Sequence, residues 1–148
     1  MSVDVQVTRT IDRPIDAVAR YAADPSNVPH WYRRIHAVRW ITDPPVAVGS
    51  RIAFDAKFMG KRLAYTYEVT EFVPGESLTM ATAEGPFPMT TEYRWSPIDD
   101  SRTRMTLRNH GEPTGFSKFA APFVTFAMRR AMTQDLRRLA SLLESGSS

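Results

Sequence analysis

The sequence predicts an α+β fold in which a curved antiparallel sheet wraps around a long C-terminal helix, with two short helices after the first strand. Three observations support this prediction. Apolar residues alternate with polar ones from Val3 to Ile11, which is the period of a half-buried strand. Turn residues separate further alternating runs from Gly49 to Asn109, and from Ser117 onward apolar residues recur every three or four positions, as in an amphipathic helix.

The size and composition of the chain are those of one folded domain. Its 148 residues, of which 43% are apolar and 24% charged, are enough to build a single hydrophobic core. We expect this domain to span residues 1–144 and residues 145–148 to form a disordered tail. The first residues do not have the pattern of a signal peptide, and no apolar run has the length of a membrane span. The interpretation is a cytoplasmic protein.

The residue content excludes several kinds of site. The chain has no cysteine, which excludes disulfides, thiolate nucleophiles and cysteine metal ligands. Its three histidines, His30, His36 and His110, have no metal-ligand spacing, so we expect neither a metal nor a cofactor. The net charge is only +3 and the arginines are scattered, which makes a nucleic-acid partner unlikely on electrostatic grounds.

Two short helices are expected after the first strand. Asp12 and Pro14 resemble the capping residue and the first-turn proline of a helix from about residue 14 to residue 23. Asp24-Pro25-Ser26-Asn27 breaks that helix, and Ser26 or Asn27 would cap one further turn through Trp31. The chain is then expected to be extended from about residue 36 to residue 41.

The turns predict a register for the hairpins. Glycine would open a two-residue turn at Gly60-Lys61, and further turns are expected at residues 73–76, 85–86 and 99–101. The opposed pairs that follow are Phe54 with Tyr67, Ile52 with Val69, Tyr67 with Thr82, Tyr65 with Glu84, Val69 with Met80, Met80 with Thr91, Leu78 with Tyr93, Tyr93 with Met105, Thr91 with Leu107 and Met89 with Asn109. This register places the apolar side chains of five strands on one face of the sheet.

That apolar face needs a cover, because a single sheet cannot bury its own apolar side. The C-terminal segment from about Ser117 to Glu144 supplies one. Its apolar residues recur at helical spacing and are Phe119, Phe123, Phe126, Ala127, Met132, Leu136, Leu139 and Leu143. The opposite face of the sheet carries charged residues and threonines, and we expect water to contact it.

Several segments resemble those of the START/SRPBCC superfamily, whose fold is called helix-grip. The segments are Ile11 to Val18, Asp24-Pro25 with His30-Trp31, Tyr67 to Gly75, Ser101 to Leu107, and Asp135 to Leu139. In order and spacing they are most similar to the polyketide cyclase/dehydrase-like branch and span almost the whole chain. The resemblance implies a cavity between the sheet and the long helix. Superfamily members include enzymes, lipid carriers and receptors, so the fold alone does not give the function.

The inner-face residues are therefore the candidate ligand wall. Aromatic and flexible side chains with a few polar ones among them are typical of a small-molecule pocket, although the same set could also form a filled core. The candidates are Trp31, Phe54, Phe58, Tyr67, Met80, Thr82, Phe87, Met89, Thr91, Tyr93, Asn109, Phe119 and Phe123.

Glu84 and Tyr65 are the candidate catalytic residues. In the predicted register, Glu84 lies on the inner face of the sheet, beside the Gly85-Pro86 turn and opposite Tyr65. If water cannot reach it, its pKa would rise and it could act as a general acid or base. The alternative is that Glu84 reaches solvent at the mouth of the pocket.

Three functions remain open. The first is binding of a small hydrophobic or aromatic molecule, such as a lipid or a polyketide-like compound, in the cavity. The second is a cyclase or dehydratase that uses the same cavity, with Glu84 or a tyrosine moving protons. The third is a protein or RNA interaction module in which Arg94, Arg104 and Arg108 on the outer sheet face make the contact. The chain is expected to be a monomer or a homodimer.

Overall fold

The computed structural model describes residues 2–112 and 120–146, and its elements follow the predicted order. The strands in this part of the chain are β1 (Val3–Ile11), β2 (Ile35–Trp40), β3 (Arg51–Phe58), β4 (Lys61–Val73), β5 (Ser77–Glu84), β6 (Met89–Asp99) and β7 (Arg102–Gly111). The helices are α1 (Ile15–Ala22), the one-turn 3-10 helix η1 (Pro25–Asn27), α2 (Val28–Trp31) and α3 (Ala121–Ser145). The predicted start of the last helix, at residues 117–119, lies outside the described residues.

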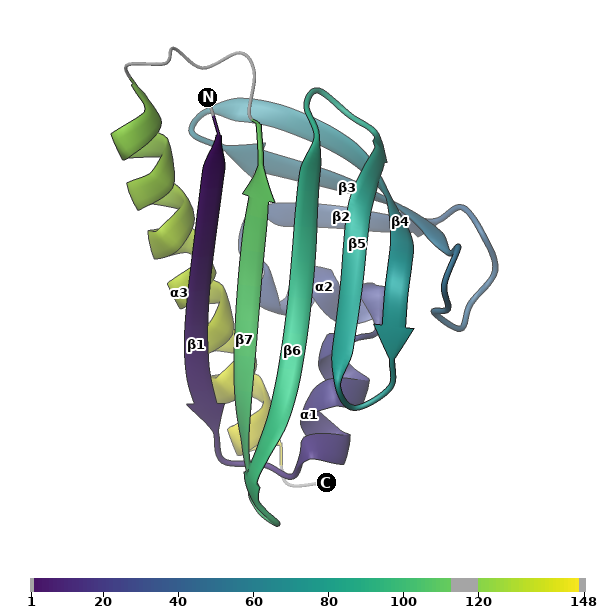
Figure 1. The fold of residues 1–148 in the computed structure, drawn as a ribbon, viewed down its shortest axis with the longest axis vertical. Coiled ribbons are helices and arrows are strands. Elements are labelled where there is room, and N and C mark those ends of the chain that lie inside the picture. Colours follow the sequence, from purple (N-terminus) through teal and green to yellow (C-terminus); the bar gives the residue numbers. More distant parts are fainter. Residues whose placement is uncertain (1, 113–119, 147–148) are drawn as a thin grey trace.

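The described strands form one antiparallel sheet of order β1-β7-β6-β5-β4-β3-β2. It curves so strongly that β2 and β3 cross behind β6 and β7 in Figure 1. The long helix α3 runs along β1, and α1, η1 and α2 close the other end of the concave side. This is the predicted helix-grip arrangement, in which the apolar face of the sheet is buried by helices on one side only.

The predicted parity of the sheet is confirmed except at Glu84, and two of its hairpins are shifted by two residues. The confirmed pairs are Val69 with Met80, Tyr67 with Thr82, Met80 with Thr91, and Leu78 with Tyr93. The shifted pairs are Phe54 with Tyr65, Ile52 with Tyr67, Tyr93 with Leu107, and Thr91 with Asn109. Because side chains alternate with a period of two, a shift of two residues leaves every side chain on its predicted face.

The shift of the β3–β4 hairpin comes from its turn. Phe58 pairs with Lys61, so the two loop residues are Met59 and Gly60 rather than Gly60 and Lys61. Both have positive φ angles, 51° and 79°, as a type I′ turn requires. Glycine is therefore the second loop residue and not, as predicted, the first. Met59 occupies the first position and adopts the left-handed backbone conformation that was expected there for glycine.

The predicted pairing of Tyr65 with Glu84 is wrong because the β4–β5 register shifts between Thr66 and Tyr67, where β5 has one extra residue, Ala83. Beyond it, Glu84 lies opposite Thr66, and its side chain is exposed. Irregularities of this kind add a residue to one strand and change the face of the residues that follow. Glu84 therefore does not lie on the inner face of the sheet, which was the reason for predicting it as a catalytic residue.

The short helices begin differently from the prediction. Asp12 does not cap α1, whose N-cap residue is Pro14 with no side-chain hydrogen bond. Asp24 caps η1 instead, because its Oδ1 accepts the backbone N–H of Ser26 at 3.0 Å. Asn27, the N-cap residue of α2, makes no side-chain cap bond either. This pair of turns places the fully buried Trp31 under the sheet and orients the next residue, Tyr32, toward the interior.

Helix α3 presents a different face from the one predicted for its first half. Val124, Met128 and Met132 are buried, whereas Phe123 is 69% exposed and Phe126 65% exposed. The apolar stripe of Phe123, Phe126 and Ala127 lies about half a helical turn from the stripe of Met132, Leu136 and Leu139, since each residue rotates the helix by about 100°. The helix can bury only one of them, and the second, longer stripe packs inside.

Candidate functional site

A cavity in two adjoining compartments lies between the concave sheet face and α3. The outer compartment, of about 140 Å³, is bounded by α3, β3, β4 and the β5–β6 loop. The inner compartment, of about 110 Å³, lies deeper, between α2 and the centre of the sheet. The two share five lining residues, which are Tyr32, Ile35, Tyr65, Met89 and Asn109. The predicted hollow under α3 is therefore present, with the core only partly filling it.

Hydroxyl and amide groups converge on the inner compartment. The hydroxyls of Tyr32 and Tyr93 lie 2.9 Å apart, and the Thr91 hydroxyl donates to the Asn109 side-chain oxygen at 2.6 Å. Tyr67 lines the same compartment as Thr91. These groups come from the α2–β2 connection and from β4, β6 and β7. The register alone places three of them side by side: Thr91 pairs with Asn109, and Tyr93 lies two residues from Thr91 on the same face of β6. A ligand that enters this compartment meets a row of hydrogen-bonding groups rather than a purely apolar wall.

Burial keeps these tyrosines protonated. It raises the pKa of Tyr67 to about 12, and it also raises the pKa values of Tyr32, Tyr65 and Tyr93. The cause is the same in each case, because taking a phenolate out of water costs more than taking out a neutral phenol. At neutral pH the four hydroxyls are therefore hydrogen-bond donors and acceptors without charge.

The outer compartment is mainly apolar with cations along one side. Its apolar walls are the side chains of Phe58, Leu63, Phe87, Val124, Met128 and Met132. Arg34 and Lys57 also line it, and the Arg34 guanidinium carbon lies 5.7 Å from the centre of the Phe58 ring. A cation over an aromatic face is attracted by the ring quadrupole, so Phe58 helps to hold Arg34 at the edge of the compartment.

Asp135 is the buried carboxylate of the cavity. It projects from α3 into the outer compartment, is only 4% exposed, and its Oδ1 accepts the backbone N–H of Arg33 at 3.1 Å. Burial raises the pKa of Asp135 from 3.8 to about 6, although the Arg33 N–H bond and nearby arginines favour the ionised form. Such a carboxylate exchanges its proton close to neutral pH, as an acid–base group must.

The ring of Tyr65 separates the two compartments and packs closely. Its centroid lies 5.7 Å from that of Tyr67 and 5.6 Å from that of Phe87. A Cβ atom added to Gly85 would lie 2.8 Å from Cδ1 of Tyr65, so the β5–β6 loop passes over this ring only because residue 85 is glycine. The loop and the ring together close the cavity on that side.

Most of the predicted ligand residues, and the predicted catalytic residue Tyr65, line the cavity. Those that do are Phe54, Phe58, Tyr65, Tyr67, Met80, Phe87, Met89, Thr91, Tyr93 and Asn109. Trp31 is fully buried behind Tyr32 and Tyr93 and does not line it, and the Thr82 hydroxyl accepts the Met89 N–H at 3.0 Å instead. Phe123 points away from the cavity, Glu84 is exposed and borders neither compartment, and Phe119 lies outside the described residues.

The sequence analysis missed Tyr32, Arg34 and Asp135. Asp135 carried a signal, because it stands between Met132 and Leu136 on the stripe that α3 buries, where a carboxylate is unexpected. Tyr32 and Arg34 follow a one-turn helix of four residues, and no periodic pattern in so short a segment shows which way their side chains point.

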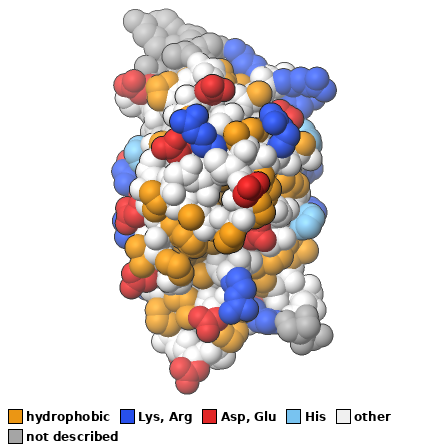
Figure 2. Space-filling view, turned by 90° about the vertical axis from the view of Figure 1, so that its right-hand side faces the viewer, with side chains coloured by type: hydrophobic (Ala, Val, Ile, Leu, Met, Phe, Trp, Pro, Cys, Tyr) orange, Lys and Arg blue, Asp and Glu red, His pale blue; other side chains and the backbone are white. Residues whose placement is uncertain are grey.

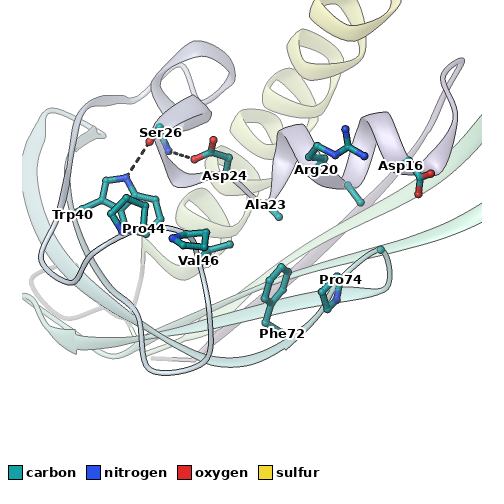
Figure 3. A pocket seen from close by; sticks show the side chains of 13 residues that line it. Asp16, Arg20, Ala23, Asp24, Ser26, Trp40, Pro44, Val46, Phe72 and Pro74 are labelled. Atoms are coloured by element: carbon teal, nitrogen blue, oxygen red, sulfur yellow. Dashed lines mark hydrogen bonds between the residues drawn. The ribbon is translucent and has the colours of Figure 1, made fainter.

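A larger hollow, of about 550 Å³, lies on the outside of the molecule between α1, η1, the β2–β3 loop and the β4–β5 turn. Figure 2 views the molecule from the side of that loop, where hydrophobic side chains gather among scattered charges. In this outer groove Trp40, Pro44, Val46 and Phe72 face Arg20 and Asp24 (Figure 3). The Trp40 indole N–H donates to Ser26 at 3.0 Å, so the best-placed donor of the groove already has its acceptor.

Two further findings bear on the sequence predictions. Among residues 2–112 and 120–146, no group of three histidine or acidic side chains lies close enough together to hold a metal ion. In the same part of the chain, no helix combines the length and the apolar character that crossing a bilayer requires.

Solved structures with this fold are similar over almost their whole length. The Zhui aromatase/cyclase of Streptomyces sp. R1128 superposes with a TM-score of 0.81 at 16% identity, covering 97% of this chain and 94% of that one. A START superfamily protein of Mycobacterium smegmatis gives 0.81 at 12% identity, with 95% and 97% covered. Major latex-like protein 151 of Panax ginseng gives 0.75 at 13%, again with 95% and 97% covered.

Sequence comparison identifies the family. A search of the curated proteins found no match to the chain. The model of one protein family, described as polyketide cyclase/dehydrase and lipid transport, matches residues 2–144. Because this match spans nearly the whole chain and the fold is that of the START-like structures, the chain belongs to the polyketide cyclase/dehydrase and lipid transport family.

Proposed function

We propose that the protein binds a small, largely apolar molecule with an aromatic ring and at least one oxygen, in the cavity under α3. The observation that carries this proposal is the combination of apolar walls with the hydroxyl row formed by Tyr32, Tyr93, Tyr67 and Thr91. Pockets for drug-sized ligands are usually about 300 Å³ or more, whereas an apolar cavity of about 150 Å³ accepts a single benzene ring. Compartments of about 140 and 110 Å³ therefore favour a compact ligand with one or two rings.

The polar groups decide the class of ligand. Burying about 300 Å² of apolar ligand surface contributes roughly 7 kcal/mol, and association costs offset at least about 4 kcal/mol of it. Without further contacts the complex is no tighter than roughly millimolar. A ring hydroxyl or ketone that reaches the Tyr32–Tyr93 pair adds the hydrogen bonds that a plain hydrocarbon or the chain of a fatty acid lacks.

The test is calorimetric titration with three probes of similar size: a naphthol, naphthalene and a ten-carbon fatty acid. We expect the naphthol to bind at least about tenfold more tightly than naphthalene, because it alone among the two-ring probes offers a hydroxyl to the inner compartment. Equal affinity for naphthol and naphthalene would show that the hydroxyl row does not contribute. Tighter binding of the fatty acid would assign the cavity to lipids instead.

Asp135 favours a second function, ring closure of a polyketone. An ionised Asp135 takes a proton from the carbon next to one carbonyl group, and the enolate attacks a second carbonyl carbon to form the new C–C bond. The alkoxide accepts the proton back from Asp135, with the Tyr32 and Tyr93 hydroxyls donating hydrogen bonds to it. Asp135 then removes the second proton of the same carbon while the C–O bond breaks, and that proton leaves with the hydroxide as water.

The chemistry of this second function has its own test. A linear seven-carbon δ-diketone closes to a methylcyclohexenone and water by these steps, and the product is followed by its ultraviolet absorption. We expect Asp135→Asn to lower the rate at least about a hundredfold while naphthol binding stays within about threefold, since general acid–base groups contribute about 10²–10⁴ in rate. No turnover by the wild-type protein would leave binding as the function.

The outer sheet face gives the interaction hypothesis little support. Arg108 forms an ion pair with Asp4 at 2.7 Å, and Arg94 forms one with Glu92. These guanidinium groups are already neutralised by neighbouring carboxylates, so the charge they can offer to a phosphate is reduced.

A further inference from the structure

Helix α3 carries an apolar surface that the described part of the chain leaves exposed. Phe123 and Phe126 are the most exposed aromatic side chains among the large hydrophobic residues of the described chain, at 69% and 65%. They lie on the side of α3 opposite Val124 and Met128, which face the cavity. Phenylalanine gains nothing from this position in the isolated molecule, because its ring stays in water.

Arginines flank the two rings. Phe126, Arg130 and Arg137 are four and seven residues apart in succession, which places them along one side of the helix. Together with Arg129 they line a surface depression of about 400 Å³. We use "outer α3 face" for the surface formed by Phe123, Phe126, Arg130 and Arg137.

No acidic side chain balances this charge among residues 120–143. The one carboxylate in that stretch, Asp135, is buried under the helix, and Glu144 lies at the far end, where its Oε2 accepts the backbone N–H of Asp12 at 2.9 Å. The outer α3 face is therefore both apolar and cationic. Exposed aromatic rings beside arginines are typical of helices that lie in the surface of a membrane.

We propose that the outer α3 face docks on a membrane surface that carries anionic lipid headgroups. The rings of Phe123 and Phe126 enter the boundary between headgroups and acyl chains, and Arg130 and Arg137 contact lipid phosphates, for which the guanidinium fork is well shaped. The first turns of α3 lie outside the β1 edge of the sheet, where a flat surface can reach them (Figure 1).

Charge favours a lipid surface over a second copy of the chain. Two copies that met through their outer α3 faces would bring Arg130 and Arg137 of both helices together with no carboxylate of that face to neutralise them. Like charges buried in one interface oppose association, whereas an anionic headgroup layer neutralises every one of these arginines.

The test is co-sedimentation of the unliganded protein with vesicles, so it does not depend on what the cavity binds. We expect the protein to partition at least about tenfold more strongly onto vesicles of about one part phosphatidylglycerol to two parts phosphatidylcholine than onto pure phosphatidylcholine. Raising NaCl from about 0.1 M to about 0.5 M screens the arginines and should remove most of that difference.

Two double variants separate the contributions. Phe123→Ser with Phe126→Ser should reduce partitioning onto anionic vesicles at least about tenfold, and Arg130→Gln with Arg137→Gln should abolish the preference for phosphatidylglycerol. The matched controls lie on other surfaces: Val48→Ser, which changes a 64% exposed side chain of the β2–β3 loop, and Arg39→Gln with Arg62→Gln, which removes two exposed arginines. The controls should bind vesicles as the wild type does.

Three results would overturn the proposal. The first is a wild-type protein that does not sediment with anionic vesicles at low salt. The second is equal loss of binding in the Arg130/Arg137 variant and its Arg39/Arg62 control, which would mean that only net charge matters. The third is a wild-type dimer, seen by light scattering, that the phenylalanine variant splits into monomers, because that would assign the face to a second copy. Circular dichroism of each variant ensures that lost binding does not reflect unfolding.

Discussion

The molecule has two hollows, and the smaller one is the better candidate site. The outer groove holds about 550 Å³, but its indole N–H is already bonded to Ser26. The cavity under α3 holds far less, yet it brings four buried tyrosine and threonine hydroxyls and the Asp135 carboxylate against apolar walls. Volume measures how much ligand fits, whereas desolvated polar groups determine how strongly and how selectively it binds.

Filling one hollow at a time tests which of the two binds the ligand. Met128→Trp places an indole in the outer compartment, and we expect it to abolish detectable naphthol binding in calorimetry. Overpacking of this kind typically costs about 1–3 kcal/mol of stability, which thermal unfolding would register. Val46→Trp is the matched change in the outer groove and should leave the affinity unaltered. The reverse outcome would move the site to the groove.

The pH dependence of stability distinguishes the buried carboxylate from the exposed ones. Burial raises the pKa of Asp135 to about 6, so between about pH 4 and pH 6 the folded state binds more protons than the unfolded state. The free energy of unfolding should therefore fall by about 3 kcal/mol as the pH rises through that window. Asp135→Asn should remove this fall, and urea unfolding at a series of pH values would measure it.

The control for that series is Asp16→Asn in the outer groove. It should shift the whole curve by less than about 1 kcal/mol, through the dipole of α1, and keep its shape. Asp4 and Asp99 act in the opposite direction, because their arginine partners lower their pKa values and the stability they contribute is lost only as the pH falls further. A wild-type curve that rises steadily from pH 4 to pH 6 would contradict the assignment to Asp135.

A smaller effect is expected from the hydroxyl row. Tyr93→Phe removes one partner of the 2.9 Å contact with Tyr32 without changing the shape of the ring. We expect naphthol affinity to fall about fivefold and naphthalene affinity to stay the same, since one hydrogen bond contributes about 1 kcal/mol. Trp40→Phe, which deletes the corresponding hydrogen bond of the outer groove, should affect neither probe. Equal losses for both probes would mean that Tyr93 acts only by packing.

The smallest effect should come from Glu84→Gln. The side chain is exposed and borders neither compartment, so naphthol affinity should change by less than about twofold, and diketone turnover, where present, should be unaffected. A large loss of turnover would return Glu84 to the mechanism, which would require the β5–β6 loop to move it inward.

The sequence alone was sufficient to predict the inner face of the sheet. Alternation has a period of two, and two of the three register errors were shifts of two residues, so Phe54, Tyr67, Thr91 and Asn109 remained on the predicted side. Nine of the predicted site residues line the cavity for this reason, and the tenth, Phe87, lies on the β5–β6 loop. The fold class followed from the same pattern together with the single long helical segment after it.

The face on which Glu84 lies and the face of α3 that is buried depend on contacts between distant segments, so only the tertiary structure reveals them. The irregularity between Thr66 and Tyr67 moved Glu84 to the outside, although nothing in the local sequence marks it. Helix α3 offered two apolar stripes half a turn apart, and the deeper packing of Met132, Leu136 and Leu139 against the sheet and its neighbouring helices selected one of them. That selection turned Asp135 into the cavity and left Phe123 outside. Periodicity defines the faces of a helix, but only the partner across the core determines which face is buried.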